Sequence, residues 1–470
     1  MNEYANEKGL KDAMAGTLKL SKDGVSVEIL NENKLRSTLI DELVWNAVFS
    51  PDENVRNLTR TVIRLAAKKY GLGPASIYDV YAARGEGKFS GVTVPAINIR
   101  GLTYETARAV FRAANKSDAG LIIIEIARSE IGYTEQRPSE YTAVVLGAAI
   151  KEGYKYPVFL QGDHYQVNGK KYKESPEKEM QGARDIIKES IEAGFYNIDI
   201  DTSTLVDLSK STIREQQELN YRIASDVTKL IREIEPKGIT VALGGEIGEI
   251  GGKNSTEDEL RAYLDGYFEM TRGLKGITKV AVQTGTTHGG IPLPDGQIAK
   301  VKLDFDTLER LGKVAQKEYK LAGCVQHGAS TLPPELFDRF PKVETAEIHL
   351  ATEFQNMVFD NPSFPADLKT QINAHLLKEN ASEKKETDTE QQFLYKTRKK
   401  AFGPFKKQIW SLPAPILKII SAGLEEKFSS LFEKLGVRNS GGIVKKYTKT
   451  VDAPVEISKT ATDEIFEGAD

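Results

Sequence analysis

Short runs of apolar, largely β-branched residues alternate with helix-like segments eight times between residues 94 and 350. The runs are VPAIN (94–98), LIIIEIA (121–127), PVFLQGD (157–163), NIDID (197–201), TVALGGE (240–246), TKVAVQ (278–283), AGCVQ (322–326) and TAEIHL (345–350). Strands that alternate with helices form parallel sheets covered by those helices. The pattern therefore predicts an α/β fold, a closed (β/α)8 TIM barrel with N-terminal and C-terminal helical extensions. The alternative is an open doubly wound sheet, but the Gly-x-Gly-x-x-Gly loop typical of it is missing from the sequence.

The intervening segments carry helix signals, and the segment after the third run shows them well. Apolar residues recur there at the spacing of one helix face. Ser175 can cap the helix, Pro176 suits its first position, and Gly194 can end it.

The regions outside the barrel divide the chain into four parts. Residues 1–90 are interpreted as an N-terminal helical extension, with two helices expected over 38–71. The barrel occupies 91–377. A charged linker is predicted over 378–392, because such polar residues bury too little apolar surface to fold. Residues 393–470 contain two further helical patterns and form a C-terminal helical extension.

The composition excludes several classes of partner. Lys plus Arg number 64 against 67 Asp plus Glu, so no basic field favours nucleic acid. No apolar stretch is long enough to cross a bilayer, and the first residues lack the basic and apolar regions of a signal peptide. The single cysteine, Cys324, rules out an intrachain disulfide and suits a reducing compartment. We therefore expect a cytoplasmic protein that binds neither nucleic acid nor membrane.

Four of the five histidines fall at or just after the C-terminal end of a predicted strand, which is where barrel enzymes place their chemistry. They are His164, His288, His327 and His349. One histidine in such a position is most often structural, but four together indicate a metal site. Neutral imidazoles that converge on one mouth and leave a position for substrate suit Zn²⁺.

Two carboxylates and a small-residue loop accompany these histidines. Asp163 precedes His164, and because neighbouring strand residues point to opposite faces, we expect the two to face different parts of the mouth. Asp163 can then move a proton on the substrate. Glu246, at the end of the fifth run, can ligate the metal or support a ligand. The HGAST loop after the seventh run lets backbone N–H groups approach a phosphate, with the hydroxyl of Ser330 beside them.

The order and spacing of these motifs resemble the class II fructose-bisphosphate aldolases. The matching motifs are GDH (162–164), the turn EIGEIGG (246–252), THGG (287–290) and HGAS (327–330). The segment AGFYNIDIDTSTL (193–205) is similar to the family's fourth strand.

The resemblance implies a zinc-dependent carbon–carbon lyase of carbohydrate metabolism, as in glycolysis. Such an enzyme cleaves fructose 1,6-bisphosphate or a related sugar phosphate into dihydroxyacetone phosphate and an aldehyde. By this resemblance, His164, His288 and His327 hold Zn²⁺ or another divalent metal, with Glu246 as an alternate ligand and Asp163 as acid and base. Substrate and phosphate contacts are expected from Gly289, Gly328, Ser330, Arg128, His349 and Thr352. A monovalent cation and a homo-oligomer are also compatible with the family.

Three segments depart from the family pattern. After the Gly-Gly turn, Lys253 and Asn254 replace the family's usual pair of acids. After the eighth run the family carries Asn-x-Asp-Thr-Asp, where this chain has Glu347, His349 and Thr352. We expect Glu347 to repel an anion there unless protonated His349 compensates for it. Arg128 replaces a small residue after the second run, where it can hold a second phosphate or pair with Glu130.

Two other functions stay open on this evidence. One is a catalytically degenerate aldolase-fold protein that binds a sugar phosphate or a partner; the departures favour it and the retained histidines disfavour it. The other is a different metalloenzyme on a barrel, although the first run lacks the His-x-His of an amidohydrolase-type site.

Three remaining features have structural interpretations. Cys324 suits a buried strand position. The basic cluster at 398–407 suits a solvated helix face with its aromatic residues packed inward, or a group that reaches a neighbouring subunit's active site. His375 suits a surface helix.

Overall fold

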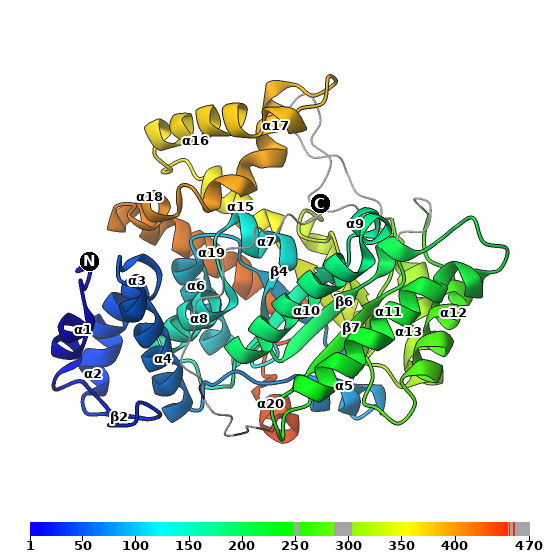
Figure 1. Cartoon of the computed structure of the whole chain (residues 1–470), viewed down its shortest axis with the longest axis horizontal. Helices are drawn as coiled ribbons and strands as arrows, with labels where there is room; N and C mark the ends of the chain where they lie inside the picture. The colour runs from blue at the N-terminus through cyan, green and yellow to red at the C-terminus, as the bar shows by residue number, and fades with distance from the viewer. Residues whose placement is uncertain (249–252, 286–302, 450, 452–454, 456–470) are drawn as a thin grey trace.

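In the computed structural model, eight parallel strands close into a barrel in the order β10-β3-β4-β5-β6-β7-β8-β9 (Figure 1). The structure describes residues 1–248, 253–285, 303–449, 451 and 455. The barrel strands are β3 (Val94–Asn98), β4 (Ile123–Ala127), β5 (Phe159–Gln166), β6 (Asn197–Asp201), β7 (Ala242–Glu246), β8 (Lys279–Ala281), β9 (Cys324–Gln326) and β10 (Glu347–Leu350). The predicted α/β barrel is confirmed. Each predicted run contains its strand, except that β5 continues beyond its run to Gln166.

Helices follow the strands and cover the barrel from outside (Figure 1). They are α6 (Thr103–Ser117), α7 (Arg128–Tyr133), α8 (Pro138–Glu152), α9 (Gly169–Glu174), α10 (Pro176–Ala193), α11 (Ile213–Ile234), α12 (Glu257–Met270), α13 (Phe305–Tyr319), α14 (Arg339–Lys342) and α15 (Thr352–Phe359). α10 begins at Pro176, and Gly194 ends it in the left-handed region at φ 101°. Ser175 occupies the N-cap position but, contrary to the prediction, its side chain makes no capping hydrogen bond.

Pairing between the first and last strands closes the barrel. β10 runs parallel to β3 with Glu347 opposite Val94, and it also pairs with β9. Every residue of β3, β4 and β10 is buried, because one face of each strand meets the barrel interior and the other meets helices. The C-terminal ends of all the strands therefore surround one mouth.

The N-terminal extension packs beside the barrel and closes its N-terminal end. It contains α1 (Glu7–Met14), the antiparallel strands β1 (Leu18–Leu20) and β2 (Val27–Ile29), α2 (Glu32–Lys34), α3 (Ile40–Phe49), α4 (Glu53–Lys69) and α5 (Tyr78–Gly85). α3 and α4 are the two helices expected over 38–71, and both pack on α8. From α5, the guanidinium of Arg84 donates to the carbonyl oxygens of Val92, Ala322 and Thr345, at the start of three strands.

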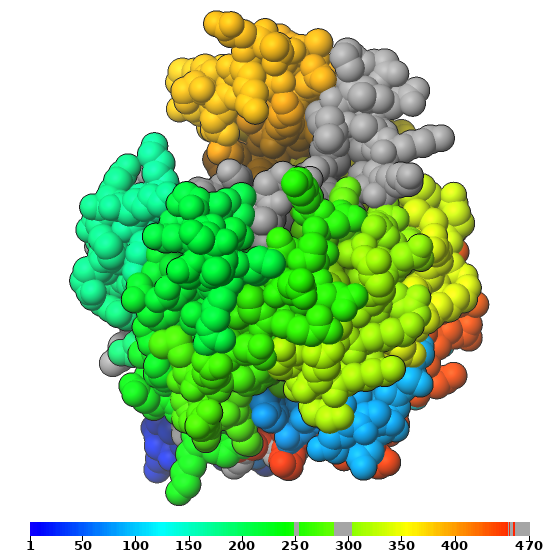
Figure 2. All heavy atoms as spheres, turned by 90° about the vertical axis from the view of Figure 1, so that its right-hand side faces the viewer, coloured from blue at the N-terminus to red at the C-terminus, as the bar shows by residue number. Residues whose placement is uncertain are grey.

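The C-terminal extension reaches both the mouth and the outer wall of the barrel. Within 393–470 it contains α18 (Lys406–Trp410), α19 (Ala414–Lys434) and α20 (Gly441–Tyr447). Before them, α16 (Ala366–Glu379) lies mostly in the range predicted as the barrel, and α17 (Glu390–Thr397) begins in the predicted linker. α16 and α17 project above the rest of the molecule, on the side where α7 and α15 lie (Figures 1 and 2). The exposed residues that join them include a short 3-10 turn (Ala381–Glu383) within the segment predicted as a linker. α19 packs on α6. Within the described ranges, no helix is long and apolar enough to cross a membrane.

Candidate active site

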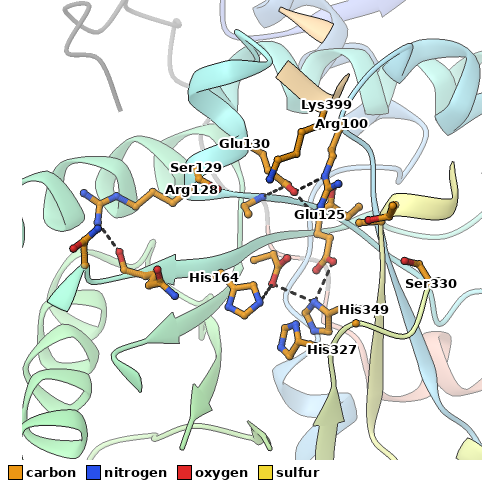
Figure 3. Close-up of a pocket in the computed structure, with 18 of the residues that line it drawn as sticks. Arg100, Glu125, Arg128, Ser129, Glu130, His164, His327, Ser330, His349 and Lys399 are labelled. Atoms are coloured by element: carbon orange, nitrogen blue, oxygen red, sulfur yellow. Dashed lines mark hydrogen bonds and ion pairs between the residues drawn. The ribbon is translucent and has the colours of Figure 1, made fainter. Parts of the chain in front are cut away.

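A cavity of about 370 Å³ opens at the C-terminal mouth of the barrel (Figure 3). The expected site residues that line it are Asp163, His164, His327, Gly328, Ser330, His349, Thr352 and Arg128. Glu246 lies in direct contact with His164. His288 and Gly289 lie outside the described residues. Side chains from the ends of several strands thus meet at one place.

An irregularity in β5 sets the directions of Asp163 and His164. The pairing of β5 with β6 shifts register between Gly162 and Tyr165, and His164 adopts a left-handed backbone conformation at φ 40°. This conformation is uncommon outside glycine and is concentrated at functional sites. Both side chains consequently line the same cavity, with Asp163 Oδ1 3.8 Å from His164 Nε2. The prediction that they face different parts of the mouth is wrong, because it assumed a regular strand.

Carboxylates surround His164. Its Nδ1 lies 3.1 Å from Asp201 Oδ2 and 3.2 Å from Glu246 Oε2, while Asp163 stands on the side of Nε2. Burial favours the neutral ring, but Asp163 and Glu246 outweigh it and raise the pKa of His164 well above its ordinary value. Burial and the carboxylate of Asp201 also raise the pKa of Glu246. The surroundings of His164 therefore favour positive charge.

His327 completes a donor set of the kind that binds a divalent metal. Its ring centroid is 4.2 Å from that of His164. One ligand atom from each of Asp163, His164 and His327 lies within 4.8 Å of the others, and the same holds for His164, Asp201 and Glu246. Imidazole nitrogens with carboxylate oxygens suit Zn²⁺ and related cations. A divalent cation can replace the proton that these carboxylates otherwise favour on His164.

A second cluster of charged side chains, centred on Lys279 of β8, fills the barrel interior. The ammonium of Lys279 lies 2.8 Å from Asp199 Oδ1 and 2.9 Å from Gln161 Oε1, and it contacts Glu347. The hydroxyl of Tyr81, from α5, also donates to Glu347. Glu347 is completely buried. The compensation by His349 that the sequence allowed for is present, because His349 Nε2 lies 2.8 Å from Glu347 Oε1, and Lys279 pairs with the same carboxylate.

His349 of β10 links the two clusters. Its Nδ1 lies 3.1 Å from Glu125 Oε1 and 3.2 Å from Asp163 Oδ1 (Figure 3). Its Nε2 lies 2.8 Å from Glu347 Oε1. Its ring centroid is 4.1 Å from that of His327. Burial opposes the charged ring, but Glu125 and Asp163 raise the pKa of His349 well above its ordinary value. Burial alone would raise the pKa of Asp163, but the adjacent imidazoles hold it well below its ordinary value.

A family model described as fructose-bisphosphate aldolase class-II matches residues 85–409, well over half of the chain. The chain belongs to the class II fructose-bisphosphate aldolase family. The resemblance inferred from the four motifs is therefore confirmed. Membership supports an aldolase activity, and this family generally uses a divalent metal, in agreement with the donor set. No curated protein matches the chain.

Three solved structures are similar to the chain at low sequence identity. One, described as a probable tagatose 6 phosphate kinase from Sinorhizobium meliloti, is 15% identical with a TM-score of 0.51 and covers 76% of this chain and 99% of its own. The fructose-bisphosphate aldolase of Campylobacter jejuni is 16% identical with a TM-score of 0.46, covering 78% and 98%. The YdjI aldolase of Escherichia coli is 14% identical with a TM-score of 0.45, covering 78% and 99%. The likeness to the Sinorhizobium meliloti structure concerns the fold alone.

Positive side chains line the aldolase cavity, with Arg100 and Lys399 close together and Arg128 extending away from them (Figure 3). Arg128 pairs with Glu179 at 2.8 Å, whereas Glu130 pairs with Arg100 at 2.6 Å. The alternative that Arg128 pairs with Glu130 is therefore wrong. Lys399, from the basic cluster of the C-terminal extension, lines the same cavity. That cluster thus contributes a cation to the mouth of its own barrel.

Sequence reasoning missed four residues of this region, Glu125, Asp199, Lys279 and Arg100. It assigned Lys399 to a basic cluster that could reach a neighbouring subunit's site, not to the cavity of its own barrel. Glu125, Asp199 and Lys279 could have been recognised from the sequence. A charged residue inside an otherwise buried strand must find a partner in the barrel interior. Arg100 follows β3 by two residues and could have been assigned to the mouth on that ground. The place of Lys399 depends on the path of the C-terminal extension, which no local pattern predicts.

Proposed function

We propose that the protein is a zinc-dependent aldolase that cleaves fructose 1,6-bisphosphate, or a related ketose phosphate, into dihydroxyacetone phosphate and an aldehyde. One observation carries this proposal. The carboxylate of Asp163 stands beside the imidazoles of His164 and His327 in a single cavity of an aldolase-family barrel. A proton acceptor next to a cation site is the arrangement that retro-aldol cleavage requires.

His164 and His327 would hold the metal together with His288, with Glu246 as an alternate ligand. Asp201 orients the ring of His164 by its contact with Nδ1, as carboxylates behind metal-bound histidines commonly do. When bound, Zn²⁺ or another divalent ion would supply a Lewis acid for the negative charge that bond cleavage leaves on the triose fragment.

Asp163 would carry the proton of the reaction. Because its pKa is held well below the ordinary value, its carboxylate is ionised and accepts the proton of the hydroxyl whose carbon becomes the aldehyde. In the condensing direction it returns that proton. A lysine Schiff base is no part of this proposal. Although burial opposes the charged form, Asp199 and Glu347 raise the pKa of Lys279 to about 12, and an ammonium group is not nucleophilic.

Two parts of the cavity suit the two ends of a phosphorylated sugar. Gly328, at φ 67°, and Ser330 belong to a small-residue loop that lets backbone N–H groups approach a phosphate. Thr352, the first residue of α15, lies beside this loop in the cavity lining. Arg128 and Lys399 supply positive charge for a second phosphate. This distribution favours a bisphosphate over a monophosphate.

The test is retro-aldol activity on a panel of ketose mono- and bisphosphates, measured as the release of triose phosphate. We expect cleavage that EDTA abolishes and that added Zn²⁺ restores. His164→Ala should abolish both cleavage and stoichiometric zinc binding. The matched control is His375→Ala, since His375 lies on α16 against Phe405 and does not line the cavity. Stoichiometric zinc without cleavage of any ketose phosphate would refute the proposal and favour the degenerate, ligand-binding alternative.

A further inference from the structure

We infer that His349 is a positioning residue for Asp163, and that Glu347 anchors His349 from inside the barrel. The inference rests on the proposed function, in which Asp163 moves the proton. His349 does not replace Asp163 in this role. It fixes the direction of the Asp163 carboxylate.

The contacts of His349 place it between two layers of carboxylates. Nδ1 faces the mouth, 3.2 Å from Asp163 Oδ1 and 3.1 Å from Glu125 Oε1. Nε2 faces the interior, 2.8 Å from Glu347 Oε1 and 3.6 Å from Asp199 Oδ2. The residue is only 5% exposed, so the ring has no other place to turn. A ring held at both nitrogens keeps one orientation.

Glu347 is itself held by groups from three further elements. Lys279 of β8 and Gln161 of β5 contact Oε1, and the hydroxyl of Tyr81, from α5, donates to Oε2. Each of these partners is buried. Because Glu347 is hydrogen-bonded at both carboxylate oxygens, it cannot move without leaving buried partners unsatisfied. Glu347 thereby holds the ring of His349 in place, and the ring in turn holds the carboxylate of Asp163 at the mouth.

Fixing one oxygen of Asp163 matters because the carboxylate would otherwise rotate about its Cβ–Cγ bond. The backbone there leaves the regular strand, since the register shifts between Gly162 and Tyr165. Asp163 still pairs with Ala127 of β4, which holds its backbone but not the rotation of its carboxylate. The contact with His349 supplies that constraint. A proton acceptor displaced by about 1 Å from its reacting position loses on the order of 100-fold in rate.

The experiment compares His349→Asn with His349→Gln. An asparagine amide can stand where Nδ1 stands, whereas a glutamine amide stands closer to Nε2. We expect H349N to retain kcat within about 5-fold and H349Q to lose about 100-fold, with KM changed less than about 3-fold in both. Zinc content, measured by mass spectrometry, should remain stoichiometric in both variants although His349 lies against the ring of His327. The matched control is H375Q, on α16.

A second measurement tests whether the loss of kcat in H349Q acts through Asp163. In an Asp163→Asn background, H349Q should cause no further loss of kcat, because the group that it positions is already gone. If H349Q does not fold, Glu347→Gln replaces it, and a loss of kcat with KM held is again expected.

Several results would overturn the inference, three of which concern the His349 variants. These three are equal losses in H349N and H349Q, loss of zinc from either variant, and additive losses when H349Q is combined with Asp163→Asn. A native chain that cleaves no ketose phosphate refutes the proposed function and this inference with it. An active native chain whose H349Q variant keeps its kcat refutes the inference alone.

Discussion

Replacing Lys279 by methionine should destabilise the barrel far more than the same change at an exposed ion pair. Lys279 is 2% exposed, and its ammonium contacts Asp199, Glu347 and the side-chain amide oxygen of Gln161. Methionine fills much of the same volume but carries no charge. Lys279→Met therefore removes the ammonium from the buried Glu347 and the partly buried Asp199, and leaves them the ring of His349 alone among the cations that the structure describes.

The expected cost is about 3–5 kcal/mol of unfolding free energy, which is typical when one partner of a buried pair is removed. Burial disfavours both charges, but the pairing raises the pKa of Lys279 from 10.5 to about 12 and lowers that of Glu347 from 4.5 to about 2. The stabilisation that Lys279 gives the folded state is thus complete below pH 10.5 and is lost as the pH rises through about 12. The stabilisation that Glu347 gives is complete above pH 4.5 and is lost as the pH falls through about 2. At pH 7.5 both are fully present.

The assay is urea unfolding at pH 7.5 followed by far-UV circular dichroism, with EDTA present so that metal binding does not add to stability. The matched control is Lys313→Met, whose lysine pairs with Glu309 on α13 and has a side chain 57% exposed. That change should cost less than about 1 kcal/mol. Equal losses in the two variants would refute the reasoning, because they would show that burial of the pair is irrelevant to its contribution.

Other expectations follow from buried groups. The thiol of Cys324, fully buried and with its pKa raised by that burial, should not react with a disulfide reagent at pH 8 until the protein unfolds; rapid reaction of the native chain would contradict its placement. Tyr81→Phe should cost about 1–3 kcal/mol in urea unfolding, because it removes a buried donor to Glu347, and an unchanged midpoint would count against that hydrogen bond. Gly441→Ala should displace α20, since a Cβ there would lie 1.9 Å from the hydroxyl oxygen of Tyr156; hydrogen exchange in α20 should accelerate, and unaltered exchange would disprove the close approach.

The strands could be predicted from sequence because each is covered on both faces. Such strands consist of short, nearly continuous apolar runs, and the turns between them mark their ends. The family motifs then assign residues such as His164 and His327 to one mouth, since all parallel strands of a barrel end there.

The directions and partners of the site side chains could not be predicted in the same way. The alternation rule fails at Asp163 and His164, because β5 is irregular where it matters. Arg128 pairs with Glu179, 51 residues away, rather than with its near neighbour Glu130. Long-range pairings of this kind depend on how helices pack after the barrel has closed, and local spacing does not encode them.

Closure of the barrel by β10 on β3 also bears on how the chain is made. The partners Val94 and Glu347 are about 250 residues apart, so at roughly 5–20 residues per second the ribosome needs roughly 10–50 s to deliver the last strand after the first. During that interval β3 has an unpaired, largely apolar edge of the kind that templates aggregation. Production of the protein should therefore depend on protection of the nascent chain, and slowing translation within the second half of the barrel should lengthen its exposure.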